Sequence, residues 1–123
     1  MAEINKESFS SLAGSLQSHP VRSLQVNLGR LCNLHCSHCH LAASPQAAEV
    51  LSWKVMERII RIVGDGGIGL VDITGGAPEL NPNLRRFIKE LSRLGADIKI
   101  RTNLVALFES DQKAWTGSFG KIM

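Results

Sequence analysis

A chain of 123 residues with a net charge of +3 is long enough for one domain. Its Lys and Arg residues are scattered and form no run, so a nucleic-acid-binding surface is not indicated. No apolar run approaches the roughly 18 residues of a membrane span, and the N-terminus lacks the apolar core of a secretory signal. The three cysteines, an odd number, argue against a disulfide framework, and a cytoplasmic location is expected.

The first elements in chain order are an extension, a strand and a loop. Residues 1–20 are expected to be an N-terminal extension, in which Phe9, Leu12 and Leu16 fit one helical stripe. The alternation in "SLQVNLG", residues 23–29, is typical of a β-strand. The cysteine segment and the small residues after it show no period, so a loop is predicted there.

Two helices and two more strands follow the loop. The pattern predicts a helix capped by Ser52 and ended by Gly64, a strand over 69–74, a helix with Asn81 as N-cap and Pro82 as first residue, ended by Gly95, and a strand over 96–103. Apolar residues recur at helical spacing in both helices. The tail, residues 104–123, has no clear period and is expected to be irregular.

The order of these elements predicts an α/β fold with parallel βα units. Buried parallel strands usually read as continuous apolar runs, whereas these strands alternate. The side away from the helices would carry polar residues: Gln25, Asn27, Asp72, Thr74, Lys99, Arg101 and Asn103. Each such group costs about 1–3 kcal/mol if it is buried without a partner. The sequence therefore favours a barrel or half-barrel with a functional inner face over a flavodoxin-like sheet.

The cysteines stand at a spacing that suits a metal centre. Cys32, Cys36 and Cys39 form C-x3-C-x2-C, which brings three thiolates to one centre from a single loop. Cysteine thiolates hold iron–sulfur clusters, usually four per cluster, so three would leave one iron with an open, catalytic position. Two alternatives stay open: a zinc site completed by His35 or His40, and a redox pair of Cys36 with Cys39.

A second candidate segment, "TGGAPE", follows the second predicted strand. The carboxyl ends of parallel strands share one edge of the sheet, so this segment and the cysteine loop are expected to meet there. Gly75 and Gly76 would allow a ligand to approach the backbone closely, and Glu79 adds a carboxylate that could hold an ammonium group. The alternative is a plain turn before a helix that begins with proline.

Together the two segments resemble the radical S-adenosylmethionine (SAM) superfamily. The three cysteines match its C-x3-C-x2-C motif, and Gly75 and Gly76 match the start of its Gly-Gly-Glu motif. The resemblance implies a 4Fe-4S cluster, SAM as cofactor, and reductive cleavage of SAM to a 5′-deoxyadenosyl radical. It also places His38 near the adenine and the double glycine at the methionine amine. Ala77 stands where the motif has its acid, and Glu79 follows two residues later.

Residues 20–104 resemble the arsenosugar-biosynthesis radical SAM proteins more closely, through "LQVNLGRLCNLHCSHCH" and "DITGGAPELNPNLRRFI". That resemblance implies a small-molecule substrate, a methylated arsenical, and an electron donor such as flavodoxin or ferredoxin. The superfamily barrel has six βα units, so residues 21–123 are expected to be a truncated core with its first three strands. Arg101 and Asn103 stand at the end of the third predicted strand, where they would reach a ligand or stay solvated at the rim. Asn103 is the candidate cofactor contact.

Overall fold

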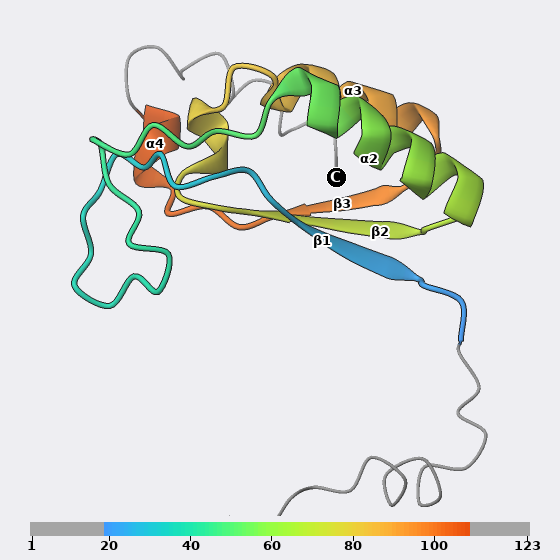
Figure 1. Cartoon of the computed structure of the whole chain (residues 1–123), viewed down its shortest axis with the longest axis horizontal. Helices are drawn as coiled ribbons and strands as arrows, with labels where there is room; N and C mark the ends of the chain where they lie inside the picture. Colours follow the sequence, from blue (N-terminus) through green and yellow to red (C-terminus); the bar gives the residue numbers. More distant parts are fainter. Residues whose placement is uncertain (1–18, 109–123) are drawn as a thin grey trace, which may run out of the picture.

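The computed structural model describes residues 19–108 and shows a three-stranded parallel sheet with two helices on one face (Figure 1). The elements are β1 (Ser23–Asn27), α2 (Trp53–Gly66), β2 (Leu70–Thr74), the 3-10 helix η1 (Pro78–Leu80), α3 (Leu84–Arg93), β3 (Asp97–Ile100) and α4 (Val105–Phe108). The strands lie in the order β1-β2-β3. The predicted α/β fold is confirmed. The stripe over residues 9–16 and the tail beyond 108 lie outside the described residues.

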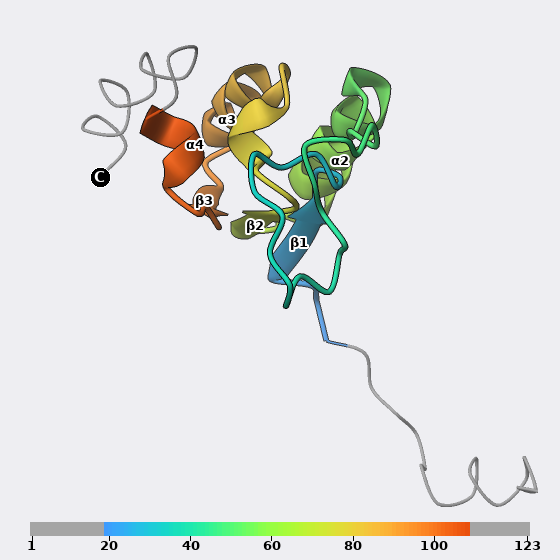
Figure 2. The ribbon, with the colours of Figure 1, turned by 90° about the vertical axis from the view of Figure 1, so that its left-hand side faces the viewer.

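The register of the sheet lines up its apolar residues beneath the helices. Two rows cross the three strands: Leu24, Val71 and Ile98, and then Val26, Ile73 and Ile100. Helices α2 and α3 cover these rows (Figure 2) with buried side chains: Met56, Val63, Leu84, Phe87, Ile88 and Leu91. Full burial of one such side chain contributes about 1.5–3 kcal/mol, so this face supplies most of the core.

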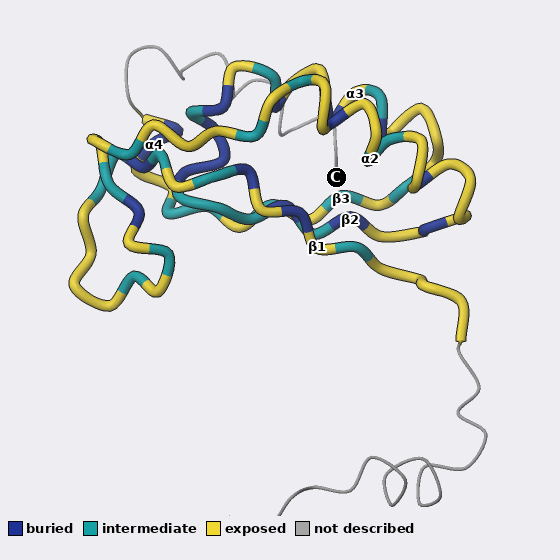
Figure 3. Tube along the Cα trace, viewed as in Figure 1, coloured by how far each residue is buried: buried dark blue, intermediate teal, exposed yellow. Residues whose placement is uncertain are grey.

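The opposite face of the sheet is open within the described residues (Figures 1 and 3). Its polar side chains are exposed in Gln25, Asn27, Lys99 and Arg101, and half-buried in Asp72 and Thr74. The alternation in the sequence is therefore the signature of a sheet with one dry and one open face. No helix in residues 19–108 combines the length and the apolar character needed to cross a membrane.

The helix boundaries differ from the prediction in two places. Helix α2 continues past Gly64 to Gly66 and ends at Gly67, whose φ of 58° is left-handed. Ser52 is the N-cap residue, as predicted, but its backbone carbonyl accepts the Met56 N–H at 3.1 Å and its side chain makes no capping bond. The later stop follows from backbone geometry, because glycine adopts a left-handed φ at little cost.

Asn81 does not cap α3, which begins at Leu84 with Asn83 as its N-cap residue. The Asn81 side chain is used elsewhere: its Oδ1 accepts the Asn83 N–H at 2.9 Å and its Nδ2 donates to the Leu51 carbonyl at 3.0 Å. The residue is buried, so it ties the end of the cysteine segment to the start of α3.

The segment after β3 also departs from the prediction. The strand ends at Ile100 instead of residue 103, and residues 105–108 form the short helix α4 within the part expected to be irregular. Asn103 starts this turn, since its Oδ1 accepts the Ala106 N–H at 3.2 Å. A side-chain acceptor at this position can start a helical turn even where the apolar residues show no helical period.

Candidate cofactor site

Two loops meet at the carboxyl ends of β1 and β2. We call residues 28–52 the cysteine loop and residues 75–83 the double-glycine loop. The backbone pairing of the two strands continues into them: the Gly76 N–H donates to the Gly29 carbonyl and the Ala77 N–H to the Leu31 carbonyl, both at 2.9 Å. The start of the cysteine loop is therefore fixed against the double-glycine loop, as the sequence predicted for two segments at one edge.

Gly75 and Gly76 are each required to be glycine, for different structural reasons. Gly75 has a φ of 141°, a conformation that residues other than glycine rarely adopt. A Cβ on Gly76 would lie 2.2 Å from the Leu31 carbonyl oxygen, so no larger residue fits there. The close approach expected between Gly76 and a ligand is thus first an approach between two protein backbones.

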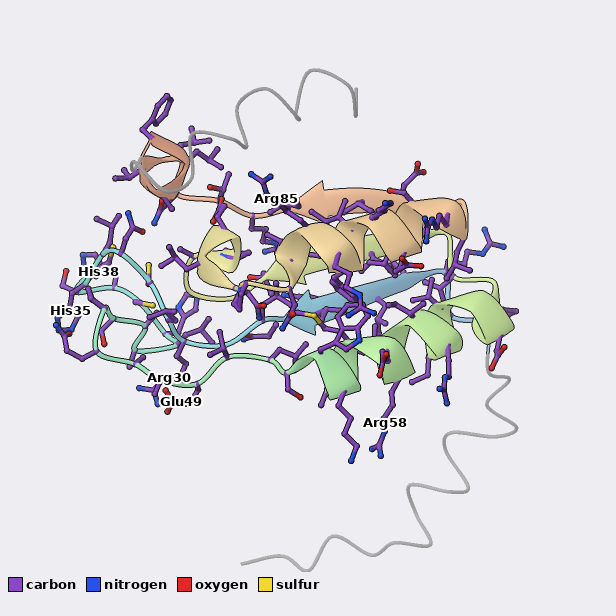
Figure 4. All side chains as sticks on the ribbon, turned by 90° about the horizontal axis from the view of Figure 1, so that it is seen from above. Arg30, His35, His38, Glu49, Arg58 and Arg85 are labelled. Carbon is purple, nitrogen blue, oxygen red and sulfur yellow. The ribbon has the colours of Figure 1, made fainter. Side chains whose placement is uncertain are left out.

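The cysteine loop folds back on itself and is closed at its base by Arg30 and Glu49, whose side chains form an ion pair at 3.0 Å (Figure 4). Arg30 also donates to the Ala42 carbonyl at 3.1 Å. Backbone bonds join Cys32 to Ser44 and Ser44 to Arg30, each at 3.1 Å. These contacts join the two sides of the loop and define its path without a helix or strand.

All three cysteines line one pocket of about 270 Å³ between the two loops. The lining residues are Cys32, Leu34, Cys36, His38, Cys39, Ala43, Gly75, Gly76 and Asn103. Cys32 is buried, Cys39 is half-buried and Cys36 is exposed, and all three are free thiols. Tertiary structure therefore gathers seven of the eight predicted site residues: the cysteines, His38, Gly75, Gly76 and Asn103.

Backbone amides point at two of the sulfur atoms. The Ala43 N–H donates to Cys39 Sγ at 3.4 Å and the Leu34 N–H donates to Cys32 Sγ at 3.5 Å. The hydrogen bond from Ala43, with a second from the Leu41 amide, lowers the pKa of the Cys39 thiol. Hydrogen bonds to the charged form favour a thiolate, which is the form that binds iron.

Asn103 reaches the pocket from beyond β3. Its Nδ2 donates to Asn33 Oδ1 at 2.9 Å and lies 3.7 Å from Cys32 Sγ. Since its Oδ1 holds the first turn of α4, the side chain links the cysteine loop to the segment after β3. The sequence analysis did not single out Asn33, Leu34 or Ala43 as site residues. Their positions between and just after the cysteines were the only indication of a role.

Glu79 is the predicted site residue that the pocket lacks. It lies in η1, is only 2% exposed, and neither of its carboxylate oxygens has a hydrogen-bond partner among the described residues. The two residues between the double glycine and the acid place Glu79 in the 3-10 turn, beneath the loop surface. Neither Ala77, at the motif position of the acid, nor Glu79 lines the pocket.

The donor set fits a cluster better than a single ion. A zinc ion takes ligands about 2.0–2.3 Å from one centre. No group of three or more His, Cys, Asp and Glu side chains within residues 19–108 is arranged to hold a metal ion, and His35 and His40 do not line the cysteine pocket. In a four-iron cluster each thiolate binds a different iron, so three thiols spread around one pocket suit it.

The chain belongs to the radical SAM superfamily, whose family model matches residues 26–114, more than half of its length. Members of this superfamily bind a 4Fe-4S cluster and SAM. The resemblance seen in the two loops is thus confirmed at the level of the superfamily.

Curated relatives are named probable GTP 3′,8-cyclase. The protein from Thermoplasma volcanium is 31% identical over 93 residues, 75% of this chain and 28% of the relative. That from Pyrococcus abyssi is 30% identical over 89 residues, 72% and 29% of the two chains, and that from Sulfurisphaera tokodaii 31% over 88 residues, 71% and 28%. The chain spans less than a third of these relatives. None of the three has an arsenosugar name, so that closer resemblance is not shown.

Proposed function

We propose that Cys32, Cys36 and Cys39 ligate a 4Fe-4S cluster that leaves one iron open to SAM. The observation that carries the proposal is the single pocket that all three thiols line, with no fourth cysteine in the chain. When bound, the cluster supplies the electron that cleaves SAM to a 5′-deoxyadenosyl radical. Leu34 and Ala43 add apolar side chains to the lining of this pocket.

The double-glycine loop is proposed to hold the methionine end of SAM. Its Gly76 and Ala77 amides are already paired with the cysteine loop, whereas the Gly75 and Gly76 carbonyls accept no backbone hydrogen bond in the described part of the chain. Carbonyl oxygens are the acceptors that an ammonium group needs. His38 and Asn103 line the same pocket and are proposed to contact the rest of the cofactor.

Anaerobic reconstitution with iron and sulfide tests the cluster. About four iron and four sulfide per chain, with broad visible absorption, are expected, and alanine at any one of the three cysteines should abolish both. His35→Ala is the matched control, because His35 belongs to the same loop but does not line the pocket. One zinc per chain without visible absorption would contradict the proposal. A SAM-induced change in the electron paramagnetic resonance spectrum of the reduced cluster tests the cofactor site.

The substrate is proposed to be a small molecule, with electrons from a flavodoxin- or ferredoxin-type donor in the cytoplasm. Radical SAM enzymes as a class act on small-molecule substrates and take electrons from reductants. Two substrates have support: a methylated arsenical, from the resemblance of the two loop segments, and GTP, from the names of the relatives. Calorimetric titration of the SAM-loaded protein with either compound tests the two candidates, and binding of one without the other decides between them.

A further inference from the structure

A second pocket opens on the polar face of the sheet, beside the cysteine pocket. It has a volume of about 370 Å³ and shares Cys39 and Gly75 with its neighbour. His40 and Leu41 close it from the cysteine loop, which extends past the strand ends toward the open face (Figures 1 and 2). A molecule bound here would therefore lie next to the proposed cluster and cofactor.

Arg101 lines this pocket and is held in place from the neighbouring strand. Its Nε and Nη2 donate to the two Asp72 carboxylate oxygens, at 3.0 and 2.6 Å. No acceptor for Nη1 is found within residues 19–108, and the Arg101 side chain is 54% exposed. The paired carboxylate thus fixes one edge of the guanidinium fork and leaves the other edge for a ligand.

The charge balance of the lining favours an anion. Arg101 is the only Lys, Arg, Asp or Glu among the described residues that line the pocket, and the Cys39 thiolate that also lines it is taken up by the proposed cluster. Asp72 stands outside the lining and faces a second cation, Lys99, its partner in the sheet register. The other acid of this face, Asp97, lies at the opposite end of β3.

The neutral lining residues also offer donors. The Asn27 Oδ1 already accepts the Gly29 N–H at 2.8 Å, so its Nδ2 is the group left for a ligand. Gln25 and Thr74 line the same pocket and bring an amide and a hydroxyl. A lining of one fixed guanidinium with several neutral donors is suited to the oxygen atoms of an anionic group.

We infer that this pocket is the substrate site and that it takes a substrate with an oxyanion group, bound by the free edge of Arg101. The inference rests on the proposed function, because the neighbouring pocket must hold the cofactor. Asp72 is a positioning residue that keeps the guanidinium in one orientation. A carboxylate and a phosphorus or arsenic oxyanion share the required chemistry, since each presents two oxygens to the guanidinium edge.

Calorimetric titration of the reconstituted full chain with inorganic phosphate, and separately with acetate, tests this inference. In Tris-chloride buffer at low ionic strength, at least one anion should bind, and Arg101→Gln should weaken it about tenfold or more, because hydrogen bonds to charged groups are the stronger ones. Lys99→Gln is the control: it removes a cation of the same face that does not line the pocket, and binding should persist. Tighter phosphate binding identifies a phosphate-like group, and tighter acetate binding a carboxylate.

A second variant guards against misfolding. Arg101→Gln leaves the partly buried Asp72 without its partner, so the double variant Asp72→Asn with Arg101→Gln is measured beside it, and circular dichroism verifies that both fold. Absence of binding by both anions, or equal binding by wild type and the folded variants, overturns the inference. Iron content and the SAM-induced spectral change are recorded on the same samples. If the wild-type protein shows neither bound iron nor the SAM-induced spectral change, the proposed function is contradicted. Anion binding is a separate readout, which reports on this pocket alone.

Discussion

The two loops that form the site differ in how deeply their residues are buried. In the double-glycine loop Ala77, Pro78, Glu79 and Asn81 are buried, whereas residues 35–38 at the tip of the cysteine loop are all exposed. Figure 4 shows His35 and His38 at this outer end, far from the sheet. The loop with the proposed metal ligands is therefore positioned through its pairing with the buried double-glycine loop, which acts as its platform.

Gly76→Val tests the platform most severely. The added side chain would collide with the Leu31 carbonyl, one residue before Cys32, so the two loops must separate. We expect loss of most of the cluster on reconstitution and a fall of about 1–3 kcal/mol in the free energy of unfolding, measured with urea. Gly69→Ser is the control for a changed glycine, because a Cβ there meets nothing within 4 Å and the backbone is not left-handed. A full cluster in Gly76→Val would show that the crossing does not position the cysteines.

Asn81→Ala removes a buried link between the loops. The Leu51 carbonyl and the Asn83 N–H would each lose a partner, and we expect the free energy of unfolding to fall by about 1–3 kcal/mol. Since the thiols do not contact Asn81, the iron content of the folded variant should equal that of wild type. Urea unfolding and iron analysis measure the two effects. An unchanged stability would mean that water replaces both bonds.

Glu79→Gln probes the acid that the platform buries. A carboxylate without a partner costs more to bury than a neutral amide, so the variant should be more stable by about 1 kcal/mol. Urea unfolding at neutral pH, beside the exposed Glu57→Gln as control, gives the difference. A loss of stability would reveal a cationic partner of Glu79, and SAM binding by the variant would then show whether that partner is the cofactor.

Arg30→Gln weakens the exposed loop at its base and should have the smallest effect. Its ion pair with Glu49 is solvent-exposed on both sides, and such pairs contribute about 0.2–1 kcal/mol. The expected change in the free energy of unfolding is within that range, and Glu49→Gln should match it. A larger loss in Arg30→Gln alone would assign the difference to the bond with the Ala42 carbonyl.

Local patterns predicted the sheet, both long helices and the two loops, because alternation and helical spacing report directly which face of an element is buried. They misplaced the end of α2, which a later glycine terminates, and the start of α3, where the Asn81 side chain has another use. Asn81 is an example: its sequence position suits an N-cap, but a carbonyl 30 residues earlier in the chain competes for its side chain.

The sequence by itself determined the three thiols, their spacing and their place after the first strand, and with the double glycine these carry the resemblance to the superfamily. Only the tertiary structure decided that Asn103 joins the cysteines and that Glu79 does not. It also paired Arg101 with Asp72 over a separation of 29 residues and placed Arg101 beside Cys39 in a second pocket. The physical reason is that these contacts depend on the register between strands and on the crossing of two loop backbones, which no local pattern encodes.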